Sequence, residues 1–501
     1  MQRFSLLTRP GLPGHFFALA AGALFPLGFA PWFFWPVSLI SLVALYFSLH
    51  KLPARSALWR GWWYGLGAYG VGVSWVYISI HVHSYTPAPL AILMTFAFVA
   101  FIAWFFAGFA WLFRKMGERY QVLNFALCFT FFEWLRSWFL TGFPWLYLGD
   151  SFIDTPLTGF APVGGVFLLG FIGCLSAVYL LQCLQNKHFK RAALLVLPWL
   201  AGFALQQVHW TTAGQPLQVV AIQGNIDQDQ KWQAEQLFPT LETYRKASEA
   251  NAEADLILWP ETAITVLPQQ AEEYLDYLNS FAKNSDTTLI TGIPYQQGAD
   301  EPLPGAFHNS ILALGNGSGI YHKQKLVPFG EYVPFAQQLR GLLNFFDIPM
   351  SEFTPGRSDQ ALLQARLGDT HFQIAPFICY EIVYPALVAE MSKDAQLMLT
   401  ISNDAWFGDS IGPLQHFGSV RMRAVENGRY LLRGTNTGIT ALIGPDGKVV
   451  DRIAQFKYGV LNSEAALMTG TTPYQYWGNW PVLLLLAAGF MFVYLRRRQE
   501  K

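Results

Sequence analysis

Long apolar runs dominate both ends of this 501-residue chain, and a more polar stretch separates them. Residues 1–208 and 481–495 are dense in Leu, Phe, Ala and Gly, whereas residues 209–480 show the mixed pattern of a globular domain. A membrane-spanning helix needs about 20 mostly apolar residues. The pattern therefore predicts about eight transmembrane helices, near residues 14–31, 33–49, 61–80, 89–113, 121–141, 162–185, 191–208 and 480–495.

The same pattern divides the chain into three predicted parts. Residues 1–208 carry transmembrane helices 1–7, residues 209–479 form an extracytoplasmic domain, and residues 480–501 carry helix 8 and a short basic tail. Lys and Arg follow the second, fourth, sixth and last spans, whereas the alternate short loops carry none. Because basic loops stay in the cytoplasm, we expect both termini there and the central domain in the periplasm of a bacterium, on the inner membrane.

Short β-rich runs alternate with helical patterns inside the central domain. Strands are expected at 217–226, 256–259, 288–293, 309–314, 372–378, 397–402, 438–442 and 448–450. Helices are expected at 240–252, opening just after Pro239, and at 272–283. Apolar strands that alternate with helices favour a layered α/β domain with both sheet faces covered.

Composition narrows the class of protein. The chain is 52% hydrophobic and only 13% charged, with a formal net charge of zero, as expected for a membrane protein. The zero net charge argues against a nucleic-acid binder, which would carry an excess of basic residues. The four cysteines lack CxxC spacing and form no zinc-like cluster with histidine, so we expect no metal site and no diffusible cofactor.

Three places in the central domain carry candidate reactive groups. Glu261 follows an apolar strand in the motif WPE, Lys323 ends the motif YHK just before LVPFGE, and Cys379 opens the motif CYE at another strand end. The other three cysteines lie in long apolar runs, so Cys379 is a candidate nucleophile. A buried structural cysteine is the alternative. Taken singly, each of the three motifs is weak evidence for catalysis.

Together, and in this order, the three motifs resemble those of the carbon–nitrogen hydrolase (nitrilase) superfamily. With many spans before the domain and one after it, the chain resembles the apolipoprotein N-acyltransferase family over essentially its whole length. The resemblance implies a membrane α-helical bundle joined to a nitrilase-like αββα sandwich, with Glu261, Lys323 and Cys379 as a catalytic triad. It also implies supporting positions around the nucleophile, namely Glu331, Tyr380 and Glu381.

The same resemblance implies an acyltransferase that works in two steps. The cysteine takes an acyl chain from the sn-1 ester of a phospholipid such as phosphatidylethanolamine and forms a thioester. The N-terminal α-amino group of a diacylglyceryl-cysteine on an apolipoprotein then accepts the chain, which is the last step of lipoprotein maturation. Glu261 is expected to act as the general base and Lys323 to stabilise the thiolate and the oxyanion. A domain carried on eight spans is expected to be monomeric.

Five further residues are candidates for contact with the substrates. Phe345 and Phe346 lie in a segment that is too apolar around residues 339–348 for an exposed loop and too short to span, so we expect it at the membrane surface, admitting acyl chains. The alternative is a small amphipathic helix packed on the domain. Trp232 either grips a lipid or packs in its loop. Asn403 and Trp406 follow the strand at 397–402 and are expected to line the site.

Several alternatives remain open from the sequence. A membrane-tethered amidase or nitrilase would pass the acyl group to water, and a transporter or lipid-binding module would carry an inert nitrilase-like domain. A cysteine–histidine pair would use His308, His322, His371 or His416, but none of them lies in a strand-end motif of this kind. Glu133 and Arg136, one turn apart in a predicted span, mark a pathway or simply pair near a helix end. Four arginines either meet lipid head groups or form internal salt bridges: Arg421, Arg423, Arg429 and Arg433.

Overall fold

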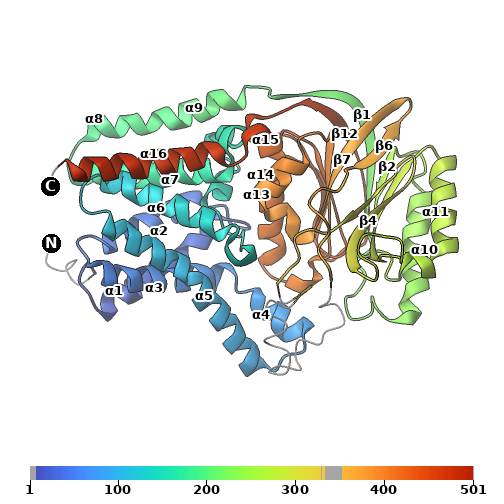
Figure 1. The fold of residues 1–501 in the computed structure, drawn as a ribbon, viewed down its shortest axis with the longest axis horizontal. Helices are drawn as coiled ribbons and strands as arrows, with labels where there is room; N and C mark the ends of the chain where they lie inside the picture. The colour runs from blue at the N-terminus through green and yellow to red at the C-terminus, as the bar shows by residue number, and fades with distance from the viewer. Residues whose placement is uncertain (1–6, 329, 333–352, 500–501) are drawn as a thin grey trace. The chain divides into compact units, whose positions relative to one another are not determined.

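The computed structural model describes residues 7–328, 330–332 and 353–499. These residues form two compact units, whose elements are labelled in Figure 1. The helical unit comprises Met1–His209, Phe407–Met422 and Trp477–Lys501, and the sheet unit comprises Trp210–Trp406 and Arg423–Tyr476. The segment Phe407–Met422 thus groups with the helical unit, although it lies within the polar central part of the sequence.

Most of the helical unit consists of α-helices that follow the apolar runs. They are α1 (Leu12–Leu24), α2 (Trp35–Ser48), α3 (Ala54–Gly72), α4 (Val76–Ile78), α5 (Ala88–Lys115), α6 (Gln121–Arg136), α7 (Ala161–Gln185), α8 (Phe189–Ala192), α9 (Val196–Gln206) and α16 (Trp480–Arg498). Three helical segments among the described residues are long and apolar enough to cross a membrane, namely Ala88–Lys115, Pro156–Gln185 and Trp480–Arg498. Two shorter helical segments are also apolar, Leu12–Gly28 and Trp35–Ser48.

The helix expected at 61–80 is shifted toward the N-terminus, as α3. It begins just after Pro53, and Arg60, which was expected in a basic loop, lies inside it and is fully buried. The Arg60 guanidinium donates to the carbonyl oxygens of Leu7 and Arg9 at 2.6 and 2.8 Å and to that of Ser48 at 3.0 Å. A buried guanidinium thus finds backbone acceptors in place of water, which the hydrophobic pattern alone does not predict.

Glycines allow three of these helices to approach closely. A Cβ atom at Gly22 of α1 would lie 2.0 Å from the Tyr64 carbonyl oxygen of α3. A Cβ atom at Gly65 of α3 would lie 2.8 Å from the Ala103 Cα atom of α5. Small residues at such crossings let backbones pack by van der Waals contact, which is how membrane helices commonly associate.

The two charged residues of α6 bond to the chain that follows the helix. Arg136 Nη1 donates to the carbonyl oxygens of Phe143 and Trp145 at 2.6 and 2.5 Å. Glu133 Oε1 accepts a hydrogen bond from the Leu148 backbone N–H at 2.8 Å. Both side chains therefore hold the loop after α6 in place, an internal bracing role.

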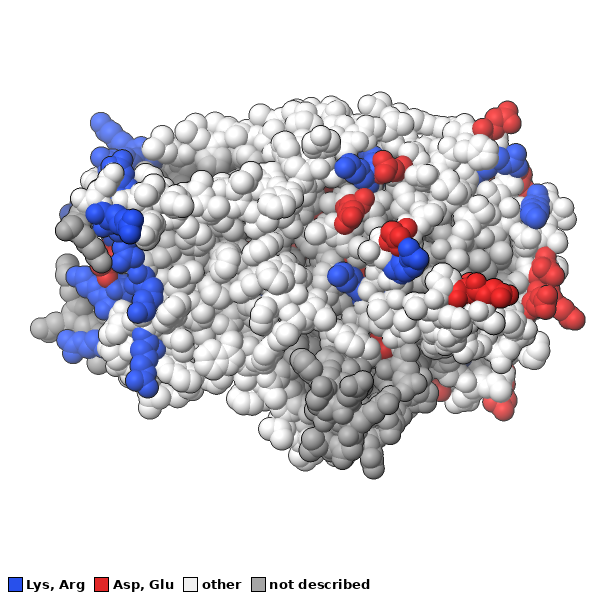
Figure 2. Space-filling view, in the orientation of Figure 1, with Lys and Arg blue, Asp and Glu red and all other residues white. Residues whose placement is uncertain are grey.

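Basic residues gather at one end of the helical unit, where both chain termini lie (Figures 1 and 2). Lys and Arg occupy the connections α2–α3, α5–α6 and α7–α8 and the last turn of α16. Such an asymmetry is what the positive-inside rule requires of a membrane protein.

The sheet unit contains two six-stranded sheets. The first sheet has the order β12 (Gly459–Gly470), β1 (Thr211–Gln223), β2 (Leu256–Leu258), β3 (Thr288–Gln296), β4 (Phe307–Gly315) and β5 (Ile320–His322). The second sheet has the order β11 (Val449–Ile453), β10 (Thr440–Ile443), β9 (Leu431–Thr435), β8 (Leu397–Ser402), β7 (Thr370–Ile378) and β6 (Leu363–Leu367). The expected turn between strands near residues 442 and 448 is confirmed, because β10 and β11 pair antiparallel.

The two sheets face each other across one apolar core, to which β1 contributes Val219, β7 Ile374 and β8 Leu399. The outer face of the first sheet is covered by α10 (Ala234–Glu249) and α11 (Glu272–Asn284), through buried side chains such as Tyr244 and Leu278 (Figure 1). In the second sheet, β7, β8 and β9 are parallel and are joined through α13 (Pro385–Met391) and α14 (Gly412–Asn427). The expected nitrilase-like layering of an α/β domain with two sheets is confirmed.

The chain enters and leaves the sheet unit through neighbouring strands. β1 and β12 pair antiparallel from Thr211↔Gly470 to Gln223↔Gly459, with one irregularity between Ala213 and Pro216. The first and last strands of the unit therefore lie side by side.

Two local predictions in this unit were wrong. Helix α10 begins at Ala234 and includes Pro239, because burial of Leu241 and Tyr244 outweighs the backbone hydrogen bond that a proline removes. The stretch around Arg433, interpreted as a connection, is part of strand β9. Of the two alternatives for Arg433, the internal salt bridge is confirmed, because the side chain is buried and paired with Asp404.

Candidate active site

The three predicted reactive residues each follow a strand of the sheet unit. Glu261 follows β2 and Lys323 follows β5, both in the first sheet, whereas Cys379 follows β7 in the second sheet. Hydrogen bonds and electrostatic interactions connect all three. The groups that the motifs single out therefore form one cluster that draws on both sheets.

Glu261 is a buried carboxylate held by two asparagines. Its Oε1 accepts a hydrogen bond from Asn309 Nδ2 and its Oε2 accepts one from the Asn403 backbone N–H, both at 2.7 Å. Burial raises the pKa of Glu261, and the nearby Glu331 carboxylate adds to the rise, while Lys323 opposes it. A carboxyl group with a raised pKa is suited to take up and return a proton near neutral pH.

Lys323 lies between two carboxylates and is only 1% exposed. Its Nζ is 2.7 Å from Glu331 Oε1 and 3.9 Å from Glu261 Oε1. Burial alone lowers the pKa of a lysine, but the charges of Glu331 and Glu261 outweigh burial and raise the pKa of Lys323 above its usual value. Lys323 is therefore held as a cation.

Cys379 occupies a sharp turn directly after β7. Its φ angle is +52°, in the left-handed region that residues other than glycine seldom adopt, and it opens a short 3₁₀ turn, Cys379–Val383. Burial raises the pKa of the thiol to about 12, with the Glu261 charge adding to the rise and Lys323 opposing it. The resting group is thus a thiol, and a base must remove its proton before it attacks.

Glu331 and Glu381 support the cluster in different ways. Glu331 bonds to Lys323, to Asn309 Nδ2 at 3.2 Å and to the Val327 backbone N–H at 2.8 Å. It therefore fixes both the lysine and the amide that contacts Glu261.

Glu381 is fully buried and ties two segments together. Its Oε1 accepts from the backbone N–H groups of Gln324 and Lys325 at 2.6 and 3.0 Å and from the Tyr321 hydroxyl at 3.0 Å. Its Oε2 accepts from the Ile378 backbone N–H at 2.8 Å. Glu381 thus joins the segment after Lys323 to the turn of Cys379, and burial raises the pKa of this carboxyl to about 7.

Tyr380 follows the cysteine directly and is 7% exposed. Its ring lies edge-on to that of Tyr384, with 5.3 Å between the ring centroids. The residue therefore packs within the turn that carries the cysteine.

The candidate substrate-contact residues differ in their exposure and in their contacts with the site. Asn403 reaches the site through its backbone N–H on Glu261, and its side chain donates to Gln228 Oε1 at 2.7 Å. Trp232 is 41% exposed, and Trp406 is half-buried in the turn after β8. Phe345 and Phe346 lie outside the described residues.

Two residues near the site, Asn309 and Lys231, were missed by the sequence analysis, whereas Ser402 belongs to the strand end that was expected to line the site. Asn309 was interpreted only as the start of a strand. Lys231, next to Trp232, is buried and donates to the Glu261 carbonyl oxygen at 3.0 Å and to Thr262 Oγ1 at 2.7 Å. Ser402 ends β8 and donates to Asp404 Oδ1 at 2.6 Å. Polar side chains at strand ends were a usable signal for Asn309 and Ser402, but their partners depend on strand register.

The histidines near the site contact one another. His308 and His322 stack with 4.4 Å between their ring centroids, and His308 Nδ1 lies 2.7 Å from the Thr354 carbonyl oxygen. Burial, followed by the His308 charge, lowers the pKa of His322 to about 4. Within residues 7–328, 330–332 and 353–499, no group of three or more His, Cys, Asp or Glu side chains is placed to hold a metal ion.

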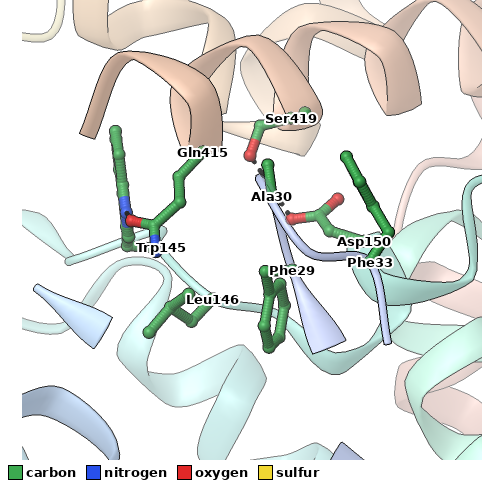
Figure 3. A pocket seen from close by; sticks show the side chains of 9 residues that line it. Phe29, Ala30, Phe33, Trp145, Leu146, Asp150, Gln415 and Ser419 are labelled. Atoms are coloured by element: carbon green, nitrogen blue, oxygen red, sulfur yellow. Dashed lines mark hydrogen bonds between the residues drawn. The ribbon is translucent and has the colours of Figure 1, made fainter. Parts of the chain in front are cut away.

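A separate small pocket lies within the helical unit (Figure 3). Gln415 and Ser419 project into it from α14, where Gln415 Oε1 accepts a hydrogen bond from Trp145 Nε1 at 2.7 Å. Asp150 faces Ser419, whose Oγ is 3.5 Å from Asp150 Oδ2. The remaining lining residues are Phe29, Ala30, Phe33, Leu146 and Gly418.

The two-sheet unit with Glu261, Lys323 and Cys379 at its strand ends defines the class of protein, and residues 218–474 match the family model described as carbon-nitrogen hydrolase. Residues 21–179 match a second model, described as apolipoprotein N-acyltransferase N-terminal domain. The chain belongs to the apolipoprotein N-acyltransferase family. This confirms the resemblance inferred from the motifs.

The relatives match nearly from end to end. The chain is 47% identical to the apolipoprotein N-acyltransferase of Pseudomonas paraeruginosa, over 98% of each chain. It is 48% identical to that of Azotobacter vinelandii, over 99% of this chain and 97% of the relative. It is 38% identical to that of Coxiella burnetii, over 95% of this chain and 99% of the relative.

Proposed function

We propose that this protein transfers an acyl chain from the sn-1 position of a membrane phospholipid to the N-terminal α-amino group of diacylglyceryl-cysteine on apolipoproteins. Family membership supports the reaction class. The observation that carries the proposal is the buried set of Glu261, Lys323 and Glu331 beside the turn of Cys379, because all the charges that acyl transfer requires are gathered there.

In the first step, Glu261 removes the proton of the Cys379 thiol, and the thiolate attacks the ester carbonyl carbon. The tetrahedral intermediate collapses by breaking the bond to the glycerol oxygen. That oxygen leaves as the alcohol of a lysophospholipid after taking the proton back from Glu261. Lys323 stays cationic throughout and stabilises the oxyanion. The product on the enzyme is a thioester.

In the second step, the α-amine of the apolipoprotein attacks the thioester carbonyl carbon. Glu261 accepts the proton that the amine loses, the carbon–sulfur bond breaks, and Glu261 returns this proton to the thiolate. The products are an amide and the resting thiol. The enzyme therefore alternates between a free and an acylated form, which is a ping-pong mechanism.

The same proposal places the protein in the bacterial inner membrane with about eight spans, its sheet unit in the periplasm and both termini in the cytoplasm. The three long apolar helices, the two shorter ones and the basic ends of alternate loops support it. We propose residues 1–208, 209–479 and 480–501 as the three parts of the chain. The partners are a phospholipid such as phosphatidylethanolamine and the diacylated apolipoprotein, and the enzyme works as a monomer without a cofactor.

The test is the intact mass of the purified protein after incubation with phosphatidylethanolamine. Wild type should gain one acyl chain that hydroxylamine removes, and Cys379→Ala should gain none. A diacylated lipopeptide should then discharge the adduct onto its own amine. Release of free fatty acid in its place would make the protein a hydrolase, and the absence of any adduct would leave a lipid-binding module.

A further inference from the structure

The strand register places a hydroxyl group beside the nucleophile. β7 and β8 are parallel, with Ile378 opposite Ile401. The next residues along the two strands are Cys379 and Ser402, so both leave the second sheet at the same edge and side by side. Ser402 is fully buried and belongs to β8.

Ser402 contacts groups on both of its sides. Its Oγ donates a hydrogen bond to Asp404 Oδ1 at 2.6 Å. The Ser402 hydroxyl is also within hydrogen-bonding reach of the Cys379 sulfur; burial, followed by the Glu261 charge, raises the pKa of the thiol, and this contact opposes the rise. A hydroxyl group has one proton and two lone pairs, and its hydrogen rotates readily between acceptors.

Asp404 is held so that it can orient this hydroxyl. Its Oδ2 accepts a hydrogen bond from Arg433 Nη2 at 2.6 Å, and both side chains are almost completely buried. Arg433 Nε donates in turn to the Ile439 carbonyl oxygen at 3.1 Å. A Cβ atom at Gly438 would lie 2.3 Å from Asp404 Oδ2, so a larger residue there would displace the carboxylate. A buried ion pair is costly to desolvate, and here it leaves one carboxylate oxygen for Ser402.

We propose that the Ser402 hydroxyl is a catalytic group that stabilises the Cys379 thiolate, and that Asp404 and Arg433 position it. In the resting enzyme the hydroxyl proton is donated to Asp404. When Glu261 takes the thiol proton, the hydroxyl hydrogen turns toward the sulfur, and Arg433 still neutralises Asp404. When the sulfur becomes a neutral thioester, the hydrogen turns back. No covalent bond to Ser402 forms or breaks, so the hydroxyl stabilises the charged state selectively.

This inference rests on Cys379 as the nucleophile of the proposed function but is tested without acyl donor or acceptor. The full chain in detergent is treated with iodoacetamide across a range of pH, and the rate of alkylation at Cys379 is followed by mass spectrometry of its peptide. Alkylation reports the thiolate population and its reactivity. Glu261, Lys323 and Asp404 are the charged groups that act on this sulfur, and all are unchanged in the variants below.

Ser402→Ala should slow alkylation at neutral pH by about 10-fold, because loss of one hydrogen bond to the thiolate raises the pKa of the thiol by about one unit. Thr400→Val is the matched control. Thr400 lies two residues earlier on β8 and so on the same face, is equally buried, and within the described residues its hydroxyl makes no hydrogen bond. This control should alkylate at the wild-type rate, and Ser402→Thr, which keeps the hydroxyl, should stay within about threefold of it.

The proposal is overturned if Ser402→Ala slows alkylation no more than Thr400→Val does. A parallel shift of the whole pH profile, with an unchanged melting temperature, is the supporting result, since a structural role would not move the titration of the sulfur. Failure of the proposed function is distinguishable: no acyl adduct would form from phospholipid on wild type, while the alkylation difference between the two variants would remain.

Discussion

The strand ends of the two sheets use buried charge in opposite ways. The first sheet brings a lysine between two carboxylates, Lys323 with Glu331 and Glu261, and these charges act directly on the reacting groups. The second sheet carries an uncharged thiol. Its buried ion pair, Arg433 with Asp404, does not include the thiol and accepts a hydrogen bond from Ser402. In the proposed mechanism the first sheet thus supplies the general base and the cation, and the second supplies the nucleophile.

The glutamates show what distinguishes a reactive carboxylate from a structural one. Glu381 accepts hydrogen bonds from three backbone N–H groups and one hydroxyl, which uses its lone pairs for holding two segments together. Glu261 accepts from Asn309 and Asn403, with Lys323 at the longer distance of 3.9 Å. The Glu381 carboxyl thus joins two segments, whereas the Glu261 carboxyl lies beside the charge of Lys323, as expected for the proposed general base.

Among the variants that test this difference between the two sheets, Glu261→Gln should have the largest effect on activity. The variant keeps the shape and size of the side chain but removes the base, so the rate of thioester formation should fall by about 10³-fold. Single-turnover intact mass measures this rate. If the variant kept the wild-type rate, another group would have to act as the base, and the proposed difference between the two sheets would be wrong.

Lys323→Met should abolish most of the activity and also destabilise the protein. Without the cation, two buried carboxylates face each other, which costs about 3–5 kcal/mol of unfolding free energy. Adding Glu331→Gln should restore much of the melting temperature but not the activity. If the double variant recovers acyl transfer, the lysine serves stability alone.

Glu381→Gln should change the pH dependence of stability more than the chemistry. Burial raises the pKa of Glu381 in the folded protein to about 7, from 4.5, so the folded state binds more protons than the unfolded state between these values. Its contribution to stability is full below pH 4.5 and is lost as the pH rises through about 7. One pKa unit corresponds to about 1.4 kcal/mol. The ionisation of Glu381 should therefore lower the unfolding free energy of the wild type by about 3 kcal/mol across this pH range.

Melting temperatures at several pH values between 4.5 and 8 measure this effect. Glu381→Gln should show a flatter profile than wild type, because amide groups do not titrate there. Equal slopes in the two proteins would mean that the carboxylate remains ionised throughout and that burial does not govern it.

The smallest effect should come from Lys231→Met. Lys231 supports Glu261 through the Glu261 carbonyl oxygen, through Thr262, which has a φ angle of +46°, and through its positive charge. Loss of these contacts should loosen the turn and reduce the acylation rate by about 3–10-fold. Lys246→Met is the control, because that lysine is 69% exposed and pairs at the surface with Glu242. Equal acylation rates in Lys231→Met and Lys246→Met would show that Lys231 does not contribute to the reaction.

The motifs predicted three candidate residues that lie in one cluster, and two of them, Glu261 and Cys379, follow strands that the sequence predicted, whereas β5 before Lys323 was not predicted. WPE, YHK and CYE pointed to Glu261, Lys323 and Cys379, and most strands were visible as short apolar runs. Asn309 on Glu261 and Ser402 beside Cys379 could not be predicted, because both contacts depend on pairing between strands distant in sequence.

Buried charges produced the other misses. Residues 433–436 were interpreted as a connection and Arg60 as part of a basic loop, although Arg433 lies in β9 and both arginines are buried against internal partners. A one-dimensional pattern treats a charge as a sign of exposure, and only the fold shows where its partner lies. The same limit hid the grouping of Phe407–Met422 with the helical unit, since its own composition resembles that of the chain around it.

The pairing of β1 with β12 has a consequence for protein engineering. Because Thr211 and Gly470 are neighbours across two strands, the chain between them is a cassette whose ends meet at a single point. Such a cassette could be inserted into another membrane protein, because its two ends lie close together. A short linker could also join the two ends in a circular permutant. The exception is Phe407–Met422, which would travel with the cassette and leave its packing partners behind. A transplanted cassette would therefore need that one surface redesigned.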